Sequence, residues 1–344
     1  MRGARHAFIW FCVGIAVLVV VLCLTLPPFP HMMKAYRITR TPKFVKENFT
    51  LTIDGSTVNP IVGQITWLED LSWRDPPVCN ESAPFILAVV ITAVENFERR
   101  ERVRSTWASP EFYQYTGIKA VFVVGYPNSK TLQESLDDEI DKYEDIIQAD
   151  FMDTYRNLTY KTISWLSWVK DWCPGTPFIA KIDDDVVVNP FNLRLYLNEY
   201  LLINPSPRQI HGRARFRAKP MRTSKWAVTK EEYPLEHYPP IVLGSAYIVD
   251  RNTVDILLAY VPYVPMLWLE DVFLTGLVAK RAGIKLKQVE RMLYSGRLSR
   301  RLYSGSQVFL VDPKENEVKQ AWEGIVRYSK KSISKLKYGY YNGV

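Results

Sequence analysis

Apolar and polar positions from Phe85 onward alternate between two kinds of segment. The first kind is a short, predominantly apolar run rich in β-branched residues, and such runs occupy residues 85–92, 120–125, 144–150 and 178–182. A run of this kind is typical of a strand that is buried on both faces. We therefore expect four buried strands.

Charged or amphipathic segments lie between these runs and predict helices. Strands and helices that alternate in this way predict an α/β fold, with a mainly parallel sheet and helices on both faces. Helices are expected at residues 95–107 with Asn96 as the N-cap, on an acidic segment with one face at Leu132, Leu136 and Ile140, and on a stripe of Leu158, Thr162, Trp165, Val169 and Trp172. The tryptophans of this last stripe could form a carbohydrate platform, but their helical spacing favours ordinary core.

Residues 7–26 form an apolar run without a charged side chain. A helix needs roughly 20 such residues to cross a bilayer. Arg2 and Arg5 precede the run and favour a cytoplasmic N-terminus. A cleaved signal peptide is the alternative, but the run is long for one, and prolines follow it without a small-residue cleavage site. The sequence predicts a cytoplasmic tail (1–6), a signal-anchor transmembrane helix (7–26) and a lumenal remainder.

Residues 27–80 are rich in proline and show no sustained period, so we expect an irregular lumenal stem. A main domain is expected at 81–312, and the basic tail at 313–344 has no predicted role. Cys79 and Cys173 are the cysteines outside the anchor; in an oxidising compartment they either pair or remain two unrelated thiols. Three N-glycosylation sequons agree with a lumenal address: Asn48, Asn80 and Asn157.

The chain has 44 Lys and Arg against 36 Asp and Glu, a net charge of +8. Such an excess suits a nucleic acid, an anionic membrane surface or the phosphates of a nucleotide. The densest basic group, residues 213–222, is interrupted by Phe216 and Pro220. Because a lumenal domain does not meet nucleic acid, we expect no nucleic-acid partner. The sequence does not fix the oligomeric state.

Three consecutive aspartates, Asp183, Asp184 and Asp185, follow directly on the predicted strand 178–182. In open α/β sheets, ligands bind at the carboxyl ends of strands. Three carboxylates there suit a hard cation such as Mg²⁺ or Mn²⁺, whereas a solvated acidic turn is the plainer interpretation. On an extended backbone Asp183 and Asp185 point the same way, so they form the natural metal pair and would bridge a substrate diphosphate.

Glu270 and Asp271 begin a second segment with candidate chemistry. These acids either stabilise the start of a helix or supply a general base beside a pocket that Trp268 helps to line. Another strand-like stretch carries Gly244 and Ser245, which are small enough for a ligand to approach closely.

Taken in order, these segments resemble the β-1,3-glycosyltransferase family (glycosyltransferase family 31), which includes β-1,3-galactosyltransferases and β-1,3-N-acetylglucosaminyltransferases. The resemblance implies a GT-A fold, a UDP-sugar donor, Mn²⁺ as cofactor, inversion at the anomeric carbon and a type II topology in the Golgi membrane. The matching stretches keep their order and spacing over residues 85–290: RRERVRSTW, FVVG, YEDIIQADFMDTYRNLTYKT, AKIDDDVVVN, YPPIVLGSAYIVD and EDVFLTGLVAKRAGI.

The same resemblance implies roles for individual residues. Asp185 would be the direct metal ligand, and Asp183 would share the metal on the nucleotide side. Asp271 would be the base that deprotonates the acceptor hydroxyl. The other implied positions are Arg100, Arg104, Asp183 and Asp184 near the donor, and Gly244, Ser245, Trp268 and Glu270 on the acceptor side.

The implied function is transfer of galactose from UDP-galactose, in β-1,3 linkage, to a glycolipid or glycoprotein glycan. Transfer of N-acetylglucosamine or N-acetylgalactosamine is the alternative within this chemistry, and a noncatalytic, membrane-tethered glycan-binding protein is the alternative of another class. The chain departs from the family pattern twice. His237 is the last histidine, so the late histidine that completes the metal shell in many relatives has no counterpart, and Ser245 and Ala246 dilute a glycine-rich block.

Overall fold

The structure is a computed structural model that describes residues 44–48, 51–53, 56–58, 61–65, 73–74, 76–79, 82–203, 208–289, 298–304 and 307–341. The predicted cytoplasmic tail and signal anchor lie outside these residues, as does Asn80. Among the helices of the described ranges, none combines the length and the apolar character that a membrane crossing requires.

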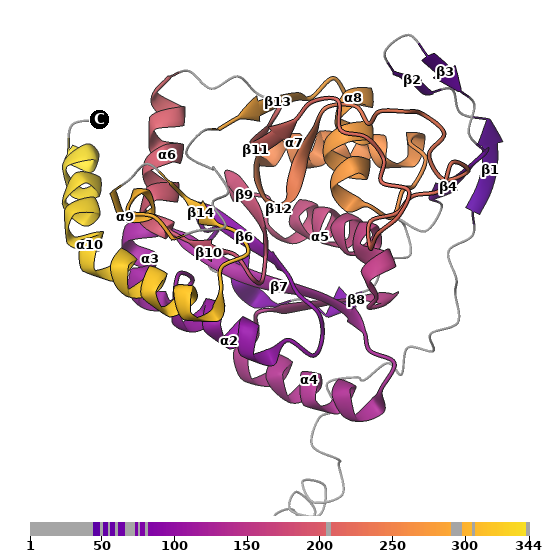
Figure 1. Cartoon of the computed structure of the whole chain (residues 1–344). Coiled ribbons are helices and arrows are strands. Elements are labelled where there is room, and N and C mark those ends of the chain that lie inside the picture. Colours follow the sequence, from indigo (N-terminus) through magenta and orange to yellow (C-terminus); the bar gives the residue numbers. More distant parts are fainter. Residues whose placement is uncertain are drawn as a thin grey trace, which may run out of the picture. The chain divides into compact units, whose positions relative to one another are not determined.

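An eight-stranded sheet forms the centre of the described domain, in the order β13-β11-β12-β9-β6-β7-β8-β5 (Figure 1). The neighbours β8, β7, β6 and β9 are parallel and are the four predicted strands, so the mainly parallel sheet is confirmed. β12 and β11 continue the sheet antiparallel, β13 pairs parallel with β11, and β5 pairs antiparallel with β8. The bounds are β5 (Trp73–Arg74), β6 (Ile86–Ile91), β7 (Ile118–Tyr126), β8 (Ile146–Met152), β9 (Phe178–Asp183), β11 (Gln209–Arg215), β12 (Ile241–Asp250) and β13 (Lys285–Gln288).

Helices cover both faces of this sheet, as the sequence predicts, because alternate residues of a strand point to opposite sides. In β6, Leu87 and Val89 belong to one hydrophobic cluster, whereas Ala88 and Val90 belong to another. Residues of α5 and α7 complete the first cluster, and residues of α2, α4 and α6 complete the second. The helix bounds are α2 (Phe97–Ser105), α3 (Pro110–Thr116), α4 (Lys130–Tyr143), α5 (Leu158–Trp172), α6 (Pro190–Leu202) and α7 (Arg251–Tyr260).

The two tryptophans of the predicted stripe on α5 differ in burial. Trp165 is fully buried, whereas Trp172 at the end of the helix is exposed. A buried indole cannot offer a face to a sugar, so the platform interpretation of this stripe is wrong for Trp165.

The segment expected to be an irregular stem contains short strands. β1 (Phe44–Asn48) pairs with β4 (Ile61–Ile65), β2 (Leu51–Ile53) pairs with β3 (Ser56–Val58), and β5 joins the main sheet. Strands of two to five residues are too short to produce a sustained alternation, which is why no periodic pattern marks them in the sequence.

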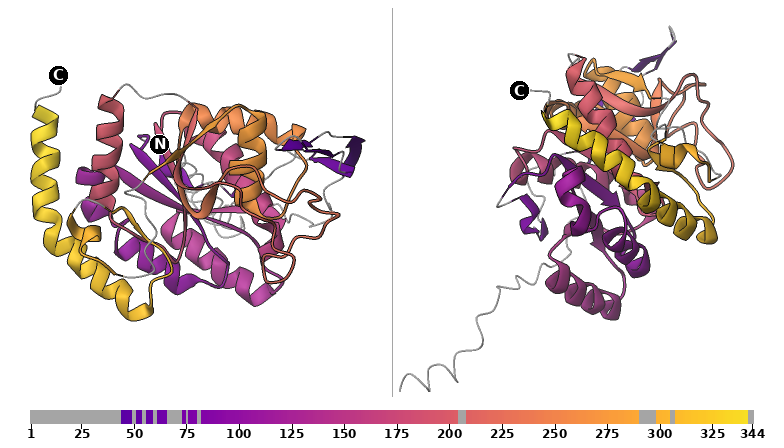
Figure 2. Two further views of the ribbon diagram at one scale, coloured as in Figure 1. Left: turned by 45° about the horizontal axis from the view of Figure 1, so that its top comes forward. Right: turned by 90° about the vertical axis from the view of Figure 1, so that its left-hand side faces the viewer.

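The basic tail at 313–344, for which the sequence predicts no role, belongs to the packed structure. It forms α10 (Glu315–Tyr341), the long yellow helix of Figure 2. Its residues Val318, Ala321 and Ile325 are buried in a third cluster with Phe191 of α6 and Leu302 of α9 (Arg301–Ser304). Just before α10, β14 (Phe309–Leu310) pairs antiparallel with β10 (Val187–Val188).

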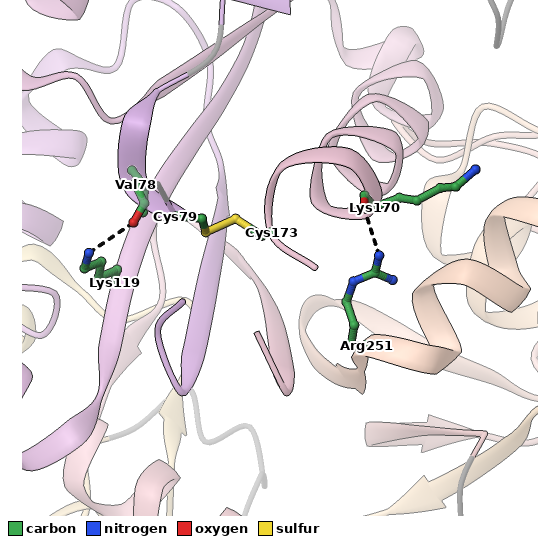
Figure 3. Close-up of a disulfide and its surroundings, with 6 residues drawn as sticks. All are labelled: Val78, Cys79, Lys119, Lys170, Cys173 and Arg251. Carbon is green, nitrogen blue, oxygen red and sulfur yellow. Dashed lines mark hydrogen bonds between the residues drawn. A yellow bond between two sulfur atoms is a disulfide. The ribbon is translucent and has the colours of Figure 1, made fainter. Parts of the chain in front are cut away.

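A disulfide joins Cys79, at the end of a 3₁₀ turn, to Cys173, which caps α5 (Figure 3). The sequence left this pairing open against two unrelated thiols. The cysteines are 94 residues apart in sequence, and their Cα atoms are 5.4 Å apart. Lys119 Nζ also holds this turn by donating to the carbonyl of Val78 at 3.0 Å.

We predict that Cys79→Ser and Cys173→Ser each lower the free energy of unfolding by about 2–4 kcal/mol, because a long closed loop restricts the unfolded chain. Urea unfolding of the oxidised protein measures this loss. The double variant serves as the control, since both substitutions remove the same bond and its loss should equal that of either single variant. A double variant that loses the sum of the two would contradict the role of the bond.

Candidate active site

The site lies at the carboxyl edge of the parallel strands, where the chain changes direction across the sheet. From β6 the chain continues to β7 and β8 on one side, and β9 then pairs with the other side of β6. The segments that follow β6 and β9 therefore diverge at their shared edge, the place where ligands bind in open α/β sheets. The amide of Asp184 donates to the carbonyl of Ile91 at 3.1 Å and joins the two segments.

Asp184, the middle aspartate, is turned into the protein and is only 6% exposed. Its carboxylate accepts from Thr92 Oγ1 at 2.7 Å, from Asn96 Nδ2 at 2.7 Å and from Arg99 Nη1 at 2.8 Å. Asn96 is the N-cap residue of α2, as predicted, but its side chain makes no capping bond and instead ties the start of the helix to Asp184. The contact with the sugar-nucleotide donor that is predicted for Asp184 stays a prediction.

The outer aspartates are the accessible ones, with Asp183 36% and Asp185 44% exposed. The sequence predicts extended backbone that points both side chains the same way. Instead, β9 ends at Asp183 and the next two residues form a turn. A turn with its middle residue pulled inward leaves the first and third side chains outside.

Lys181 lies two residues before Asp183 on β9, so both side chains project from the same face. Its buried Nζ is 2.7 Å from Asp183 Oδ1 and 3.0 Å from Glu270 Oε1, and it also donates to the carbonyl of Gly244. Burial raises the pKa of Asp183 to about 7; Lys181 opposes this shift, and Glu270 and Asp185 add to it. One cation thus binds the aspartate turn, the Glu270 segment and β12.

Asp185 sits between a cation and another acid. Arg99 Nη1 is 3.6 Å from its Oδ2. The antiparallel pair β10–β14 begins two residues after Asp185 and ends two residues before Asp312. Burial, Asp184 and Asp312 raise the pKa of Asp185, and Arg99 opposes them.

Glu270 and Asp271 differ in environment although they are neighbours. Glu270 is buried and contacts Lys181, Thr162 Oγ1 at 3.3 Å and the hydroxyl of Tyr247 at 3.4 Å. Asp271 is half-buried; its Oδ1 accepts from the amide of Val272 at 2.8 Å, and its Oδ2 from the amide of Gly244 at 3.2 Å. Burial raises the pKa of Asp271, and the two amides oppose this shift.

The segment after Asp271 is a π-helix, η5 (Val272–Val278), followed by the short α8 (Ala279–Arg281). All seven residues of η5 are buried, and the helix continues into α8, whose Lys280 and Arg281 are exposed. Gly244 has a steric reason to be glycine, because a Cβ there would lie 2.6 Å from Glu270 Oε1. Ser245, the other small residue predicted on the acceptor side, is half-buried beside it.

The two arginines predicted near the donor lie among acids of the protein itself. Arg100 is fully buried, with Nε 2.9 Å from Glu139 Oε1, and it donates to two backbone carbonyls. Arg104 bonds to Glu139 and Asp145 at 2.7 and 2.8 Å. The described structure brings neither side chain to the aspartates, and the arginine that does reach them is Arg99. Their predicted contact with the donor is untested.

Trp268, which is predicted on the acceptor side, is buried among other side chains, and its predicted role is untested. Its ring is 6.0 Å from that of Tyr155, and Arg156 lies 4.7 Å from its centroid. Nearby, Asn157 Nδ2 donates to the carbonyl of Met152 at 2.8 Å, and the hydroxyl of its sequon partner Thr159 is buried against the carbonyl of Leu267. Glycosylation of Asn157 stays a prediction, as it does for Asn48 and Asn80.

Several residues of the site were not predicted. Lys181 has a sequence signal, since it precedes Asp183 by two on a strand whose other residues are apolar. Thr92, Asn96, Arg99 and Asp312 have none, because only the fold brings them to the aspartates.

Among the described residues, no three His, Cys, Asp or Glu side chains converge closely enough to hold a metal ion alone. Asp183 and Asp185 nevertheless suit a hard divalent cation, because such ions are often held by one or two carboxylates together with substrate phosphates.

We predict that Lys181→Met lowers the free energy of unfolding by about 3–5 kcal/mol, because it leaves Glu270 buried without its cation. The double variant Lys181→Met, Glu270→Gln should recover part of this loss. Urea unfolding measures both. Lys130→Met is the matched control: its ion pair with Glu134 is exposed, so its removal should have little effect. Equal losses for the two lysine variants would refute the central role of Lys181.

The chain is similar in sequence to known β-1,3-galactosyltransferases. The chain is 33% identical over 214 residues to human β-1,3-galactosyltransferase 5, covering 61% of this chain and 67% of that protein. It is 30% identical over 216 residues to mouse β-1,3-galactosyltransferase 1, covering 61% and 64%. A solved glycosyltransferase involved in glycosylation of the major capsid of PBCV-1 covers 69% of this chain and 98% of its own, at 12% identity and a TM-score of 0.38, which is a loose likeness.

The model of the galactosyltransferase family matches residues 98–290, more than half of the 344 residues, and this range contains the aspartate turn, Lys181, Gly244, Glu270 and Asp271. The chain belongs to the galactosyltransferase family and is a UDP-sugar-dependent hexosyltransferase.

Proposed function

We propose that this chain is an inverting β-1,3-galactosyltransferase with a GT-A fold that moves galactose from UDP-galactose to a glycan on a lipid or protein. The family and its relatives named β-1,3-galactosyltransferases support the reaction. The observation that carries the proposal is the division of labour between Glu270 and Asp271. Glu270 is buried against Lys181, and Asp271 is the acid that an acceptor can reach.

Asp271 has the properties of a general base. Its two backbone hydrogen bonds fix the carboxylate, and each oxygen keeps a further lone pair that can accept an acceptor hydroxyl. Its raised pKa makes it a better proton acceptor than an exposed aspartate. Asp271 would take the proton as the hydroxyl oxygen attacks the anomeric carbon from the face opposite to UDP, which inverts that centre.

We propose that Asp183 and Asp185 hold Mn²⁺ together with oxygens of the donor diphosphate and water. A divalent cation bound there supplies positive charge to the departing UDP. Lys181 and Arg99 hold the aspartate turn in place on either side.

The proposed address is the Golgi membrane, with a type II topology and a lumenal catalytic domain at 81–312. The apolar run 7–26 supports the anchor. The disulfide between Cys79 and Cys173 supports an oxidising compartment.

The test is sugar transfer by the full-length chain with Mn²⁺, using UDP-galactose, UDP-N-acetylglucosamine and UDP-N-acetylgalactosamine and a panel of β-glycoside acceptors, with products identified by mass spectrometry. We expect galactose transfer, and we expect Asp271→Asn to lower kcat by about 10²–10⁴-fold while UDP binding stays within twofold. The exposed Asp138 of α4 provides the control, Asp138→Asn, which should keep full activity.

The amide that Asp271→Asn introduces would place an NH₂ group against one of two backbone N–H donors, so thermal unfolding must accompany the kinetics. A folded Asp271→Asn variant with normal turnover would remove Asp271 as the base. Transfer of only an N-acetylhexosamine would replace the proposed donor, and UDP binding without any transfer would favour a noncatalytic glycan-binding protein.

Calorimetry of UDP binding, with Mn²⁺ and with chelator, tests the metal ligands without any turnover. We expect Asp185→Asn to weaken Mn²⁺-dependent UDP binding at least about tenfold, because it removes one charged oxygen ligand. Binding in chelator should be equal for this variant, the wild type and Asp138→Asn. Unchanged Mn²⁺-dependent binding by Asp185→Asn would remove Asp185 from the metal shell.

A further inference from the structure

A second buried lysine, Lys161 of α5, lies at the carboxyl edge of the parallel strands. Its Nζ is 2.9 and 3.0 Å from the two carboxylate oxygens of Asp153, and it donates to the carbonyl of Thr92 at 2.5 Å. Asp153 follows directly on β8, and Thr92 follows directly on β6. Because β7 lies between these two strands in the sheet, Lys161 joins strand ends that do not pair with each other.

The carboxylate of Asp153 extends this connection to β7. Its Oδ2 accepts from the amide of Gly125 at 2.9 Å, and its own amide donates to the carbonyl of Tyr126 at 2.9 Å. Gly125 leaves no room for a side chain, since a Cβ there would lie 2.4 Å from the carbonyl oxygen of Phe151. The ends of β6, β7 and β8 are therefore held together through one buried ion pair.

Three consecutive carbonyls after β6 are bound by two buried cations. Lys161 takes the carbonyl of Thr92, and Arg100 of α2 donates to those of Ala93 and Val94 at 2.7 and 2.9 Å. Lys161 and Arg100 are 1% and 0% exposed, so neither cation can exchange these partners for water. The path of residues 92–94 is fixed from both sides, and Arg100 supports this segment from α2.

The hydroxyl of Thr92 carries this fixed position to the aspartate turn. Its Oγ1 donates to Asp184 Oδ2 at 2.7 Å, and both side chains are buried. A hydrogen bond to a carboxylate is strong and depends on where its donor stands. Since the inward position of Asp184 is what leaves Asp183 and Asp185 outside, the placement of Thr92 bears on the orientation of that pair.

We propose that Lys161 is a positioning residue for the donor, because its bond to the Thr92 carbonyl keeps the Thr92 hydroxyl on Asp184. With Asp184 held inward, Asp183 and Asp185 are presented to the metal and the donor diphosphate. This assignment rests on the proposed donor and metal site and adds to it a side chain that touches neither ligand. Lys161 acts through the backbone of Thr92, so its loss weakens metal-dependent donor binding and leaves acceptor binding unchanged.

The first test removes the hydroxyl of Thr92 from the full-length chain. We expect Thr92→Val to weaken Mn²⁺-dependent UDP binding about tenfold in calorimetry, because it keeps the shape of the side chain but loses a bond to a carboxylate. Thr92→Ser keeps the hydroxyl and should bind UDP within twofold of the wild type. Thr116→Val is the matched control: Thr116 is also buried, and its hydroxyl donates to the carbonyl of Phe112 at 3.0 Å, away from the aspartates.

The second test removes the ion pair. Lys161→Met alone leaves Asp153 buried without its cation and is expected to be strongly destabilised. The double variant Lys161→Met, Asp153→Asn removes both charges, and its amide oxygen still accepts from the amide of Gly125. We expect this variant to fold by thermal unfolding, to bind Mn²⁺ and UDP about tenfold more weakly and to raise the KM for the donor alone. Lys119→Met, which also removes a lysine bond to a carbonyl, should leave UDP binding unchanged.

Binding by Thr92→Val that equals that of Thr92→Ser would overturn the assignment, and so would wild-type Mn²⁺-dependent binding by the folded double variant. An equal loss of UDP affinity with Mn²⁺ and in chelator would also overturn it, because the positioning acts on the metal pair. Weaker Mn²⁺-dependent UDP binding by both variants, in a protein that transfers no sugar, would uphold the role of Lys161 and refute the transferase proposal.

Discussion

The buried ammonium group of Lys181 is the contact on which the arrangement of the site depends. It stands between the carboxylates of Asp183 and Glu270 and donates to the carbonyl of Gly244, so it binds the ends of β9, β12 and the segment before η5 to one another. Moving several charges out of water costs free energy unless each finds an opposite partner, and this geometry supplies those partners. Since Lys181 engages Glu270, the neighbouring Asp271 keeps a half-buried carboxylate that is held by two backbone amides.

The sheet explains why such distant segments meet. β6 has parallel neighbours on both sides, and the chain leaves it in one direction and returns on the other. Thr92 and Arg99 follow β6, and the aspartate turn follows β9, so their contact with Asp184 closes the gap between the diverging loops. The candidate active site therefore lies where this topology opens an edge, and helices pack on both faces of the sheet beside it.

The sequence predicts the parts of the fold that are governed by long, regular burial. The four parallel strands and α2, α4 and α5 follow from apolar runs and stripes, and the aspartates stand out because they end a buried strand. Short-range pattern does not reveal contacts that the fold alone creates. Asn96 has the sequence position of a cap, yet it bonds to Asp184, 88 residues away. The sequence also does not show which of the neighbours Glu270 and Asp271 is buried against Lys181, because only the fold brings Lys181 to Glu270. The π-helix η5 is missed because its fully buried run has no polar face.

The pairing of β10 with β14 has a consequence for how the protein is made. The turn that carries Asp185 is followed at once by β10, whose partner lies more than 100 residues later in the chain. While the ribosome is still short of residue 310, the parallel strands and Lys181 have already emerged, but the edge beside Asp185 has no partner strand and the third hydrophobic cluster has no α10. A chain that stalls late in translation thus contains the central sheet but lacks the β14 strand and the α10 helix that complete the structure beside the aspartate turn.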